Sequence, residues 1–274
     1  MTLPVKAKQF IRSAFKDGGV VCLTGAGVSA ESGIPTFRGK GGLWEKYDPQ
    51  VYAYPEGLLG LLRARPRALV DFLTDLYTVL LEARPNPAHT ALAALENKGI
   101  VQAVITQNID NLHQRAGTRN CVEVHGNAFR IRCARCAVRI TFERGRVNEM
   151  LESLRRGAGS ANALRRIMSR YFPRCRCGGR FRIDVVLFGE PLPEDAFEEA
   201  VELVRGSKVL MLVGTSLAVY PAAGLPAYAK DAGAVLIEVN KEDTVFSKLC
   251  DHRIRACAGD ALPQILHALE RAKI

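Results

Sequence analysis

The stretch that most constrains the fold is an apolar run followed at once by a glycine-rich turn. Val20 to Thr24 is typical of a short buried strand, and Gly25-Ala26-Gly27 follows it, with Ala30 three residues on. In dinucleotide-binding folds such spacing permits a tight turn, close approach of the backbone to a pyrophosphate, and packing of the next helix on the strand. The pattern predicts a helix whose N-terminus faces phosphates. A glycine turn without a ligand produces the same pattern, so the motif needs support from the rest of the chain.

The acidic residue that dehydrogenases carry about 20 positions after the glycines is missing here. That distance falls in Gly39–Glu45, which is typical of a loop. We therefore expect an insertion after the first helix. Residues 40–84, with a predicted helix from Pro66 to Leu81, form that helical insertion.

Predicted strands and helices alternate along most of the chain, which is typical of a parallel sheet covered on both faces. Small or polar residues follow four strands, which end at Thr24, Thr106, Val213 and Val239. Ligands of open α/β sheets bind at such carboxyl ends, and the repetition favours a ligand over a bare turn. We predict an α/β fold with a Rossmann-like parallel sheet. Residues 1–39, 85–125 and 184–274 form the large domain, and 40–84 with 126–183 form a smaller one.

Two histidines lie near the predicted polar edge. His89 is in the first turn of a helix that starts after Pro85-Asn86-Pro87, and a packed or capping role is favoured for it. His125 ends a short strand that starts at Val122. Because its ordinary pKa is near neutral, His125 is a candidate general base.

Two close cysteine pairs, Cys133 with Cys136 and Cys175 with Cys177, suit one tetrahedral zinc ion. Four thiolates leave no open coordination position, so the metal is expected to be structural. Free thiols are the alternative. Residues 141–170, between the pairs, are expected to be an exposed helical excursion. The chain has eight cysteines and no signal-peptide pattern, so we expect a cytoplasmic protein without disulfides.

The net charge of +10 permits an acidic partner such as a nucleotide or a nucleic acid. The basic residues are taken to be spread along the chain, so the charge alone selects neither partner. No apolar run reaches transmembrane length, and no membrane partner is expected.

The motifs together resemble those of the sirtuins, the NAD-dependent protein deacylases of the Sir2 type. The resemblance rests on the order and spacing of Gly25–Arg38, Thr106–Asp110, His125-Gly126, the cysteine pairs and Gly214–Ser216 with Val239-Asn240. It covers roughly residues 5–270. A combined match of this kind is specific, whereas each motif alone is not.

The resemblance implies roles for individual residues. His125 is implied as the general base, and Asn108 as a second catalytic residue. NAD contacts are implied for a set that includes the glycine turn and the polar strand ends: Gly25, Ala26, Gly27, Ala30, Thr36, Phe37, Arg38, Trp44, Gln107, Asn108, Ile109, Asp110, Gly214, Thr215, Ser216, Asn240, Lys241 and Ala258. The substrate peptide is implied to pair with an edge that contains Val185, Val186, Phe188 and Gly189.

The implied reaction transfers an acyl group from lysine to ADP-ribose and releases nicotinamide. Acetylated proteins are therefore the implied substrates; chromatin proteins are possible among them, and nucleic acid is not required. Sirtuins that prefer succinyl- or malonyl-lysine carry a Tyr-x-x-Arg pair, but here Tyr77 is followed by Leu80. Without the arginine, an acidic acyl group lacks a bidentate partner, so neutral acyl groups are expected.

Two other functions compete with deacylation. Mono-ADP-ribosyl transfer to protein belongs to the same family. A basic, zinc-containing nucleic-acid-binding module is the alternative from another class, but the cysteine region lacks interleaved aromatic residues for base stacking.

Overall fold

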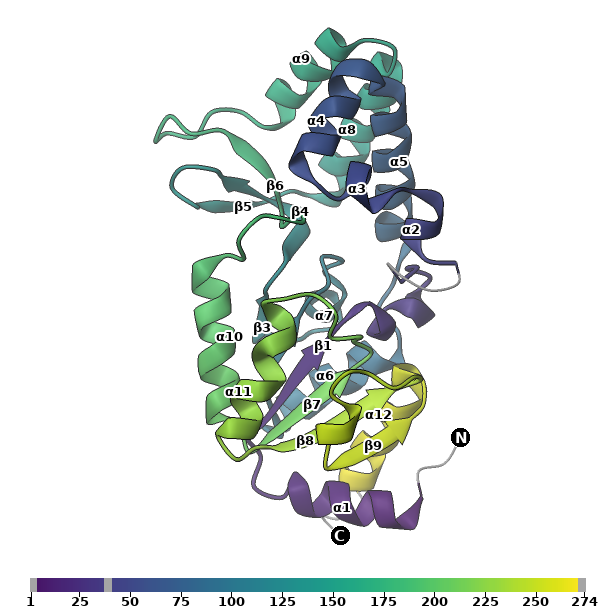
Figure 1. The fold of residues 1–274 in the computed structure, drawn as a ribbon, viewed down its shortest axis with the longest axis vertical. Coiled ribbons are helices and arrows are strands. Elements are labelled where there is room, and N and C mark those ends of the chain that lie inside the picture. Colours follow the sequence, from purple (N-terminus) through teal and green to yellow (C-terminus); the bar gives the residue numbers. More distant parts are fainter. Residues whose placement is uncertain (1–3, 37–40, 271–274) are drawn as a thin grey trace. The chain divides into compact units, whose positions relative to one another are not determined.

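The computed structural model describes residues 4–36 and 41–270 (Figure 1). The chain divides into two compact units. The large unit takes in residues 1–34, 84–125 and 192–274, and the small unit takes in residues 35–83 and 126–191. Each unit is described by itself below. Within the described residues, no helix is long and apolar enough to cross a membrane.

The large unit is built on a six-stranded parallel sheet with the order β3-β2-β1-β7-β8-β9. The central strand pairs with β2 on one side and β7 on the other, so Leu23 lies between Ile105 and Leu212. The strand order reverses between β1 and β7, which is the point where ligands bind in such sheets. The predicted Rossmann-like fold is confirmed. The strands are β1 Val20–Thr24, β2 Val101–Thr106, β3 Cys121–Glu123, β7 Val209–Val213, β8 Val235–Asn240 and β9 His252–Arg255.

Helices cover both faces of this sheet (Figure 1). Cys22 and Met211 belong to the core beneath one group of helices, whereas their neighbours Leu23 and Leu212 belong to the other core. Alternate residues of each strand therefore enter different cores, which explains the uninterrupted apolar runs in the sequence. One face carries α1 Val5–Ala14, α6 Pro87–Asn97 and α12 Ala258–Glu270; the other carries α10 Glu194–Gly206 and α11 Leu225–Asp231. Short turns are α7 Leu112–Arg115, η3 Ala222–Gly224 and η4 Ser247–Leu249.

Four helices of the small unit pack in a ring: α4 on α5, α5 on α8, α8 on α9, and α9 on α4. These helices are α4 Pro55–Ala64, α5 Pro66–Glu82, α8 Arg144–Gly157 and α9 Ala161–Tyr171, and the short α2 Leu43–Lys46 and α3 Pro49–Tyr52 precede them. The expected exposed excursion at 141–170 is therefore wrong in part. Val147, Met150, Leu151 and Leu154 of α8 are buried, because the two insertions share one apolar core.

A three-stranded antiparallel sheet completes the small unit, in the order β5-β4-β6. Its strands are β4 Gly126–Cys133, β5 Arg139–Thr141 and β6 Phe181–Val185. The structure corrects the expected domain boundary at residue 184. Residues 184–191 belong to the small unit, because β6 pairs with β4 and places Phe181 opposite Cys133.

Candidate active site

Two glycine turns interlock where β1 and β7 end. The amide of Gly27 donates to the carbonyl oxygen of Gly214 at 2.7 Å. A Cβ atom on Gly27 would lie 2.7 Å from that oxygen, and one on Gly214 would lie 2.4 Å from the amide nitrogen of Val28. Gly214 also has a φ of 57°, which side chains tolerate poorly. The two backbones can approach this closely because both contact positions, Gly27 and Gly214, lack a side chain.

The helix expected after the first glycine turn is absent, and that prediction is wrong. Two single 3₁₀ turns, η1 Ala26–Val28 and η2 Ala30–Ser32, occupy its place. Ala30 is exposed and does not pack a helix on the strand. The chain leaves β1 through these turns and not through a helix, because the side chain of Ser29 is buried in the polar cluster described next. The close approach at Gly27 is made by Gly214 of the same unit.

A buried polar cluster lies behind the glycine turn. The hydroxyl of Ser29 donates to Oδ2 of Asp110 at 2.6 Å and accepts from Nδ2 of Asn108 at 3.2 Å. Asn108 also donates to the carbonyl oxygen of Gly25 at 3.1 Å. Burial raises the pKa of Asp110, while the hydrogen bond from Ser29 opposes the shift. The cluster fixes an amide, a hydroxyl and a carboxyl group at the ends of β1 and β2.

Two neutral histidines, His89 and His113, lie next to this cluster. Their rings lie 4.8 Å apart between centroids. Nδ1 of His89 accepts from the amide of Asn86, and its Nε2 lies 3.4 Å from the hydroxyl of Ser29. The predicted capping role of His89 is therefore confirmed, since Asn86 and His89 form a reciprocal capping box. Burial lowers the pKa of His89 to about 4 and that of His113 well below its ordinary value.

His113 lies within reach of two threonines at the strand ends. Its Nε2 is 3.0 Å from Oγ1 of Thr24, which donates to Oγ1 of Thr106 at 2.9 Å. The threonine hydrogen is used in that bond, so Nε2 of His113 is the donor to Thr24. Nδ1 of His113 is then an acceptor, and it has no hydrogen-bond partner among the described residues.

The candidate base His125 is oriented by one hydrogen bond. Its Nδ1 lies 2.9 Å from the carbonyl oxygen of Gln107. A carbonyl oxygen only accepts, so Nδ1 carries the proton and Nε2 keeps its lone pair. Burial lowers the pKa of His125, and the bond to Gln107 opposes the shift. At neutral pH the side chain is therefore an uncharged acceptor at Nε2.

The ends of β7 and β8 are joined through polar groups. Thr215 accepts from the side-chain amide of Gln107 at 2.8 Å through its hydroxyl, and from Asn240 at 3.1 Å through its carbonyl oxygen. Ser216 and Lys241 are exposed beside them. Ala258 is buried at the start of α12, where the next amide, of Gly259, donates to Glu31 at 2.7 Å. Segments distant in sequence thus meet along one edge of the sheet.

Several expected site residues belong to the small unit. Thr36 accepts from the amide of Leu43 at 2.9 Å, and the ring of Trp44 lies 6.2 Å from that of Phe188. Val185 ends β6, an edge strand of the small sheet. Val186 and Gly189 flank Phe188 in the segment that follows β6. Phe37 and Arg38 lie outside the described residues.

The four predicted metal ligands lie together. Their sulfur atoms are all within 4.8 Å of one another, with Sγ–Sγ distances of 3.5 Å for Cys133–Cys177 and 3.7 Å for Cys136–Cys175. Tetrahedral zinc at about 2.3 Å from each sulfur needs sulfurs about 3.8 Å apart. The amides of Arg135 and Gly179 donate to the sulfurs of Cys133 and Cys177, both at 3.4 Å. These cysteines therefore fit one structural zinc ion.

The Sir2 family profile matches residues 25–221, which is most of the chain. The chain belongs to the Sir2 family. It is 42% identical over 252 residues to an NAD-dependent protein deacylase of Pyrococcus abyssi, covering 92% of this chain and 93% of the relative. It is 46% identical over 253 residues to NAD-dependent protein deacylase 2 of Pyrobaculum aerophilum, covering 92% and 91%.

Solved Sir2 structures have the same fold. A Sir2 homologue in complex with ADP-ribose has a TM-score of 0.79 and 34% identity and covers 97% of both chains. A Sir2 structure with a p53 peptide and NAD has a TM-score of 0.74 and 33% identity, and covers 98% of this chain and all of the other.

Buried polar residues that the sequence analysis did not assign lie beside the candidate site residues, namely Ser29, Asn86, Thr24 and His113. Asn86 was expected only as part of a helix start, yet its side chain also donates to the carbonyl oxygen of Val28 at 2.8 Å. A hydroxyl between two apolar residues, as at Ser29, was the available signal in the sequence. It was insufficient because its partner Asp110 is 81 residues away.

Proposed function

We propose that this chain is an NAD-dependent protein deacylase that removes acetyl and other neutral acyl groups from lysine side chains. Membership of the Sir2 family and the relatives above support the activity. The observation that carries the proposal is the neutral His125, whose Nδ1 proton is held by the carbonyl oxygen of Gln107.

The polar groups of the large unit fit a dinucleotide. Asn108, Thr215 and Asn240 offer amide and hydroxyl groups at strand ends that flank the switch point of the sheet. Such groups suit ribose hydroxyls and a carboxamide, and they lie where ligands bind in sheets of this kind. These residues would hold NAD, which supplies the ribose that receives the acyl group and nicotinamide as the leaving group.

The chain's own residues then have separate tasks. Nε2 of His125 accepts a proton from a ribose hydroxyl, and the carbonyl oxygen of Gln107 keeps the ring in the required tautomer. The hydroxyl of Ser29 holds the carboxyl group of Asp110 in place and is itself held by the side-chain amide of Asn108. Zinc would be held by the four cysteines and supplies no chemistry to the reaction, because its coordination is complete.

Substrate selection is proposed to favour neutral acyl groups. Tyr77 is buried and its hydroxyl donates to the carbonyl oxygen of Ala128 at 3.1 Å, and Leu80 is also buried. This helix face offers no arginine at position 80 to pair with an acidic acyl group. Acylated proteins are the proposed substrates, chromatin proteins among them, and the cytoplasm is the proposed compartment.

The test is turnover of an acetyl-lysine peptide by the wild type and by His125→Ala, with and without NAD. Loss of acetyl with release of nicotinamide, dependent on NAD and abolished in the variant, is the expected result. Isotope from labelled NAD appearing on protein while the peptide stays acetylated would instead assign ADP-ribosyl transfer.

A further inference from the structure

The net charge of the chain is concentrated in one segment. Residues 126–191 contain 15 arginines, no lysine and five acidic residues, a formal charge of +10 that equals that of the whole chain. The rest of the chain has 23 basic and 23 acidic residues. The expectation that the charge is spread along the chain is therefore wrong. A bound zinc ion with four thiolates would subtract two charges and leave the segment strongly basic.

Five of the 15 arginines are half-buried and have structural roles. Arg130, Arg132 and Arg139 surround the carboxylate of Asp184, which is 1% exposed. Arg182 pairs with Glu190 through its two terminal nitrogens, Nη1 and Nη2. Arg144 donates to the carbonyl oxygen of Leu80. Two of the five acidic residues are consumed in these pairs.

The remaining ten arginines are exposed: Arg135, Arg146, Arg155, Arg156, Arg165, Arg166, Arg170, Arg174, Arg176 and Arg180. Within the described residues none of them has an ion pair. We call them the arginine surface. They lie on α8, on α9 and around the two cysteine pairs. Because guanidinium groups bind phosphates bidentately, an unpaired set of this size favours a polyanionic partner.

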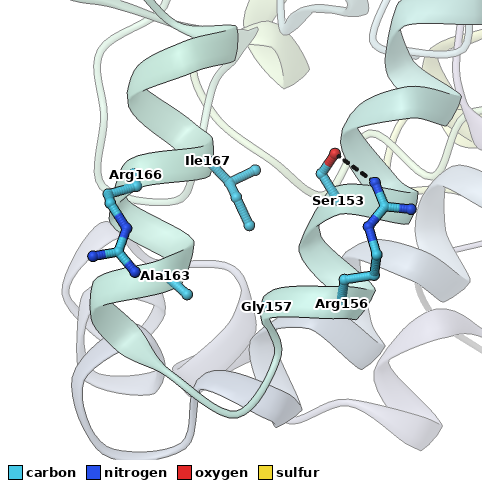
Figure 2. A pocket seen from close by; sticks show the side chains of 6 residues that line it. All are labelled: Ser153, Arg156, Gly157, Ala163, Arg166 and Ile167. Atoms are coloured by element: carbon cyan, nitrogen blue, oxygen red, sulfur yellow. Dashed lines mark hydrogen bonds between the residues drawn. The ribbon is translucent and has the colours of Figure 1, made fainter.

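Figure 2 shows one part of the arginine surface at close range. A groove between α8 and α9 is lined by Arg156, Arg166 and Ser153, with Ile167 between the helices. Arg156 donates to the hydroxyl of Ser153 at 3.3 Å. Gly157 stays small there, because a Cβ atom would lie 2.7 Å from Cδ1 of Ile167. Both helices thus contribute an exposed arginine to the lining of this groove.

The aromatic residues of the segment distinguish between nucleic-acid forms. Single strands are held by stacking bases on exposed aromatic rings. Here Phe129, Phe142, Tyr171, Phe172 and Phe181 are buried, and Phe188 packs against the rings of Trp44 and Tyr54. A surface that offers arginines without aromatic rings fits the phosphate backbone of a duplex.

We propose that the arginine surface docks the protein on the phosphate backbone of double-stranded nucleic acid, without reading its sequence. This inference does not rest on the proposed deacylase activity. It gives the protein a second binding function.

The experiment measures fluorescence anisotropy of a labelled 20-base-pair DNA duplex with the zinc-loaded full chain at several salt concentrations. The test variant replaces Arg155, Arg156, Arg165 and Arg166 with Gln. The matched control replaces Lys6, Lys16, Arg205 and Lys208, which are exposed on the large unit, and so removes the same charge. Deacetylation of an acetyl-lysine peptide and the melting temperature are measured for both variants, to check that each is active and folded.

We expect the wild type and the control to bind the duplex, and the test variant to bind at least tenfold more weakly. The slope of log K against log salt should fall by about 3–4 in the test variant, since each phosphate contact contributes about 0.9. Equal losses in both variants would show that net charge alone acts, and would overturn the proposal. So would absence of binding at low salt, tighter binding of a single strand, or equal competition by polyglutamate.

Discussion

Nδ1 of His125 lies 2.9 Å from the backbone carbonyl oxygen of Gln107, and this single bond fixes which ring nitrogen can accept a proton. The carbonyl leaves His125 one tautomer, with the lone pair on Nε2. Gln107 itself follows β2 and donates to Thr215 through its side chain, so the proposed base is positioned from the sheet.

The first prediction concerns the pH profile of turnover. Burial lowers the pKa of His125 from its ordinary value of 6.5, and the neutral ring is the active form in the proposed reaction. Activity should therefore be constant through neutral pH and fall only as the pH drops below 6.5. The logarithm of kcat/KM against pH measures this limb. An inflection above 6.5 would contradict the assignment of His125 as the base.

The second prediction concerns stability in acid. His89 has a folded pKa of about 4 against 6.5 for the free side chain, so the unfolded chain binds the proton first. The stability that the neutral, buried ring of His89 contributes is fully present above pH 6.5. It is lost as the pH falls toward 4, which lowers the free energy of unfolding by about 3 kcal/mol. Burial of His113 acts in the same direction, and the raised pKa of Asp110 opposes it.

Urea unfolding at pH 7 and pH 4.5 measures this loss, and His89→Gln supplies the comparison. Glutamine keeps a polar group near Asn86 but does not titrate. The pH dependence should therefore be smaller in the variant than in the wild type. An unchanged dependence would show that other groups cause the acid sensitivity.

The third prediction tests the interlocked glycine turns. Gly214→Ala places a methyl group 2.4 Å from the backbone of Val28 and strains a residue with positive φ. We expect a loss of roughly 2–3 kcal/mol in the free energy of unfolding, together with loss of turnover. Gly60→Ala is the control, since Gly60 is exposed within α4 and meets no atom within 4 Å. That change should stabilise the chain by about 0.5–1 kcal/mol.

The fourth prediction concerns the metal. Elemental analysis should find one zinc ion per chain, and Cys177→Ser should release it. Strong chelators should lower the melting temperature, because the zinc ion holds β4 and the segment before β6 together. Cys257→Ser, which is outside the cysteine cluster, should keep the metal. Retention of zinc by the Cys177 variant would exclude this ligand set.

The fifth prediction concerns acyl selectivity. Succinyl-lysine peptides should react at least about tenfold more slowly than acetyl-lysine peptides, because a charged hydrogen bond of about 1.5–3 kcal/mol is missing. Butyryl-lysine peptide is the neutral control of similar length. Comparable kcat/KM for the succinyl and acetyl peptides would show that another cation recognises the acid.

Sequence periodicity predicted the large sheet well, since β1 was expected at Val20–Thr24 and is found there. Apolar runs of this length that alternate with predicted helices are compatible with few folds other than a parallel sheet covered on both faces. Two of the failures share one physical cause. The missing helix after Gly27 and the position of β6 both depend on partners far along the chain, Asp110 and β4. Local propensity carries no information about such partners.

Cysteine spacing predicted a cluster that the structure brings within reach of one metal ion. By contrast, the cluster of Ser29, Asp110 and His113 was predicted only in part, because hydroxyl and imidazole groups have many alternative roles. Burial distinguished those roles, and burial at these positions is set by the tertiary fold.

The central position of β1 has a consequence during synthesis on the ribosome. Strand β1 is made early, but one of its two neighbours, β7, begins only at Val209. Until then one hydrogen-bonding edge of a strand that is apolar from Val20 to Leu23 stays unpaired, which favours aggregation. Nascent chains that stop before Val209 should therefore depend on chaperones, whereas the finished chain closes its own sheet.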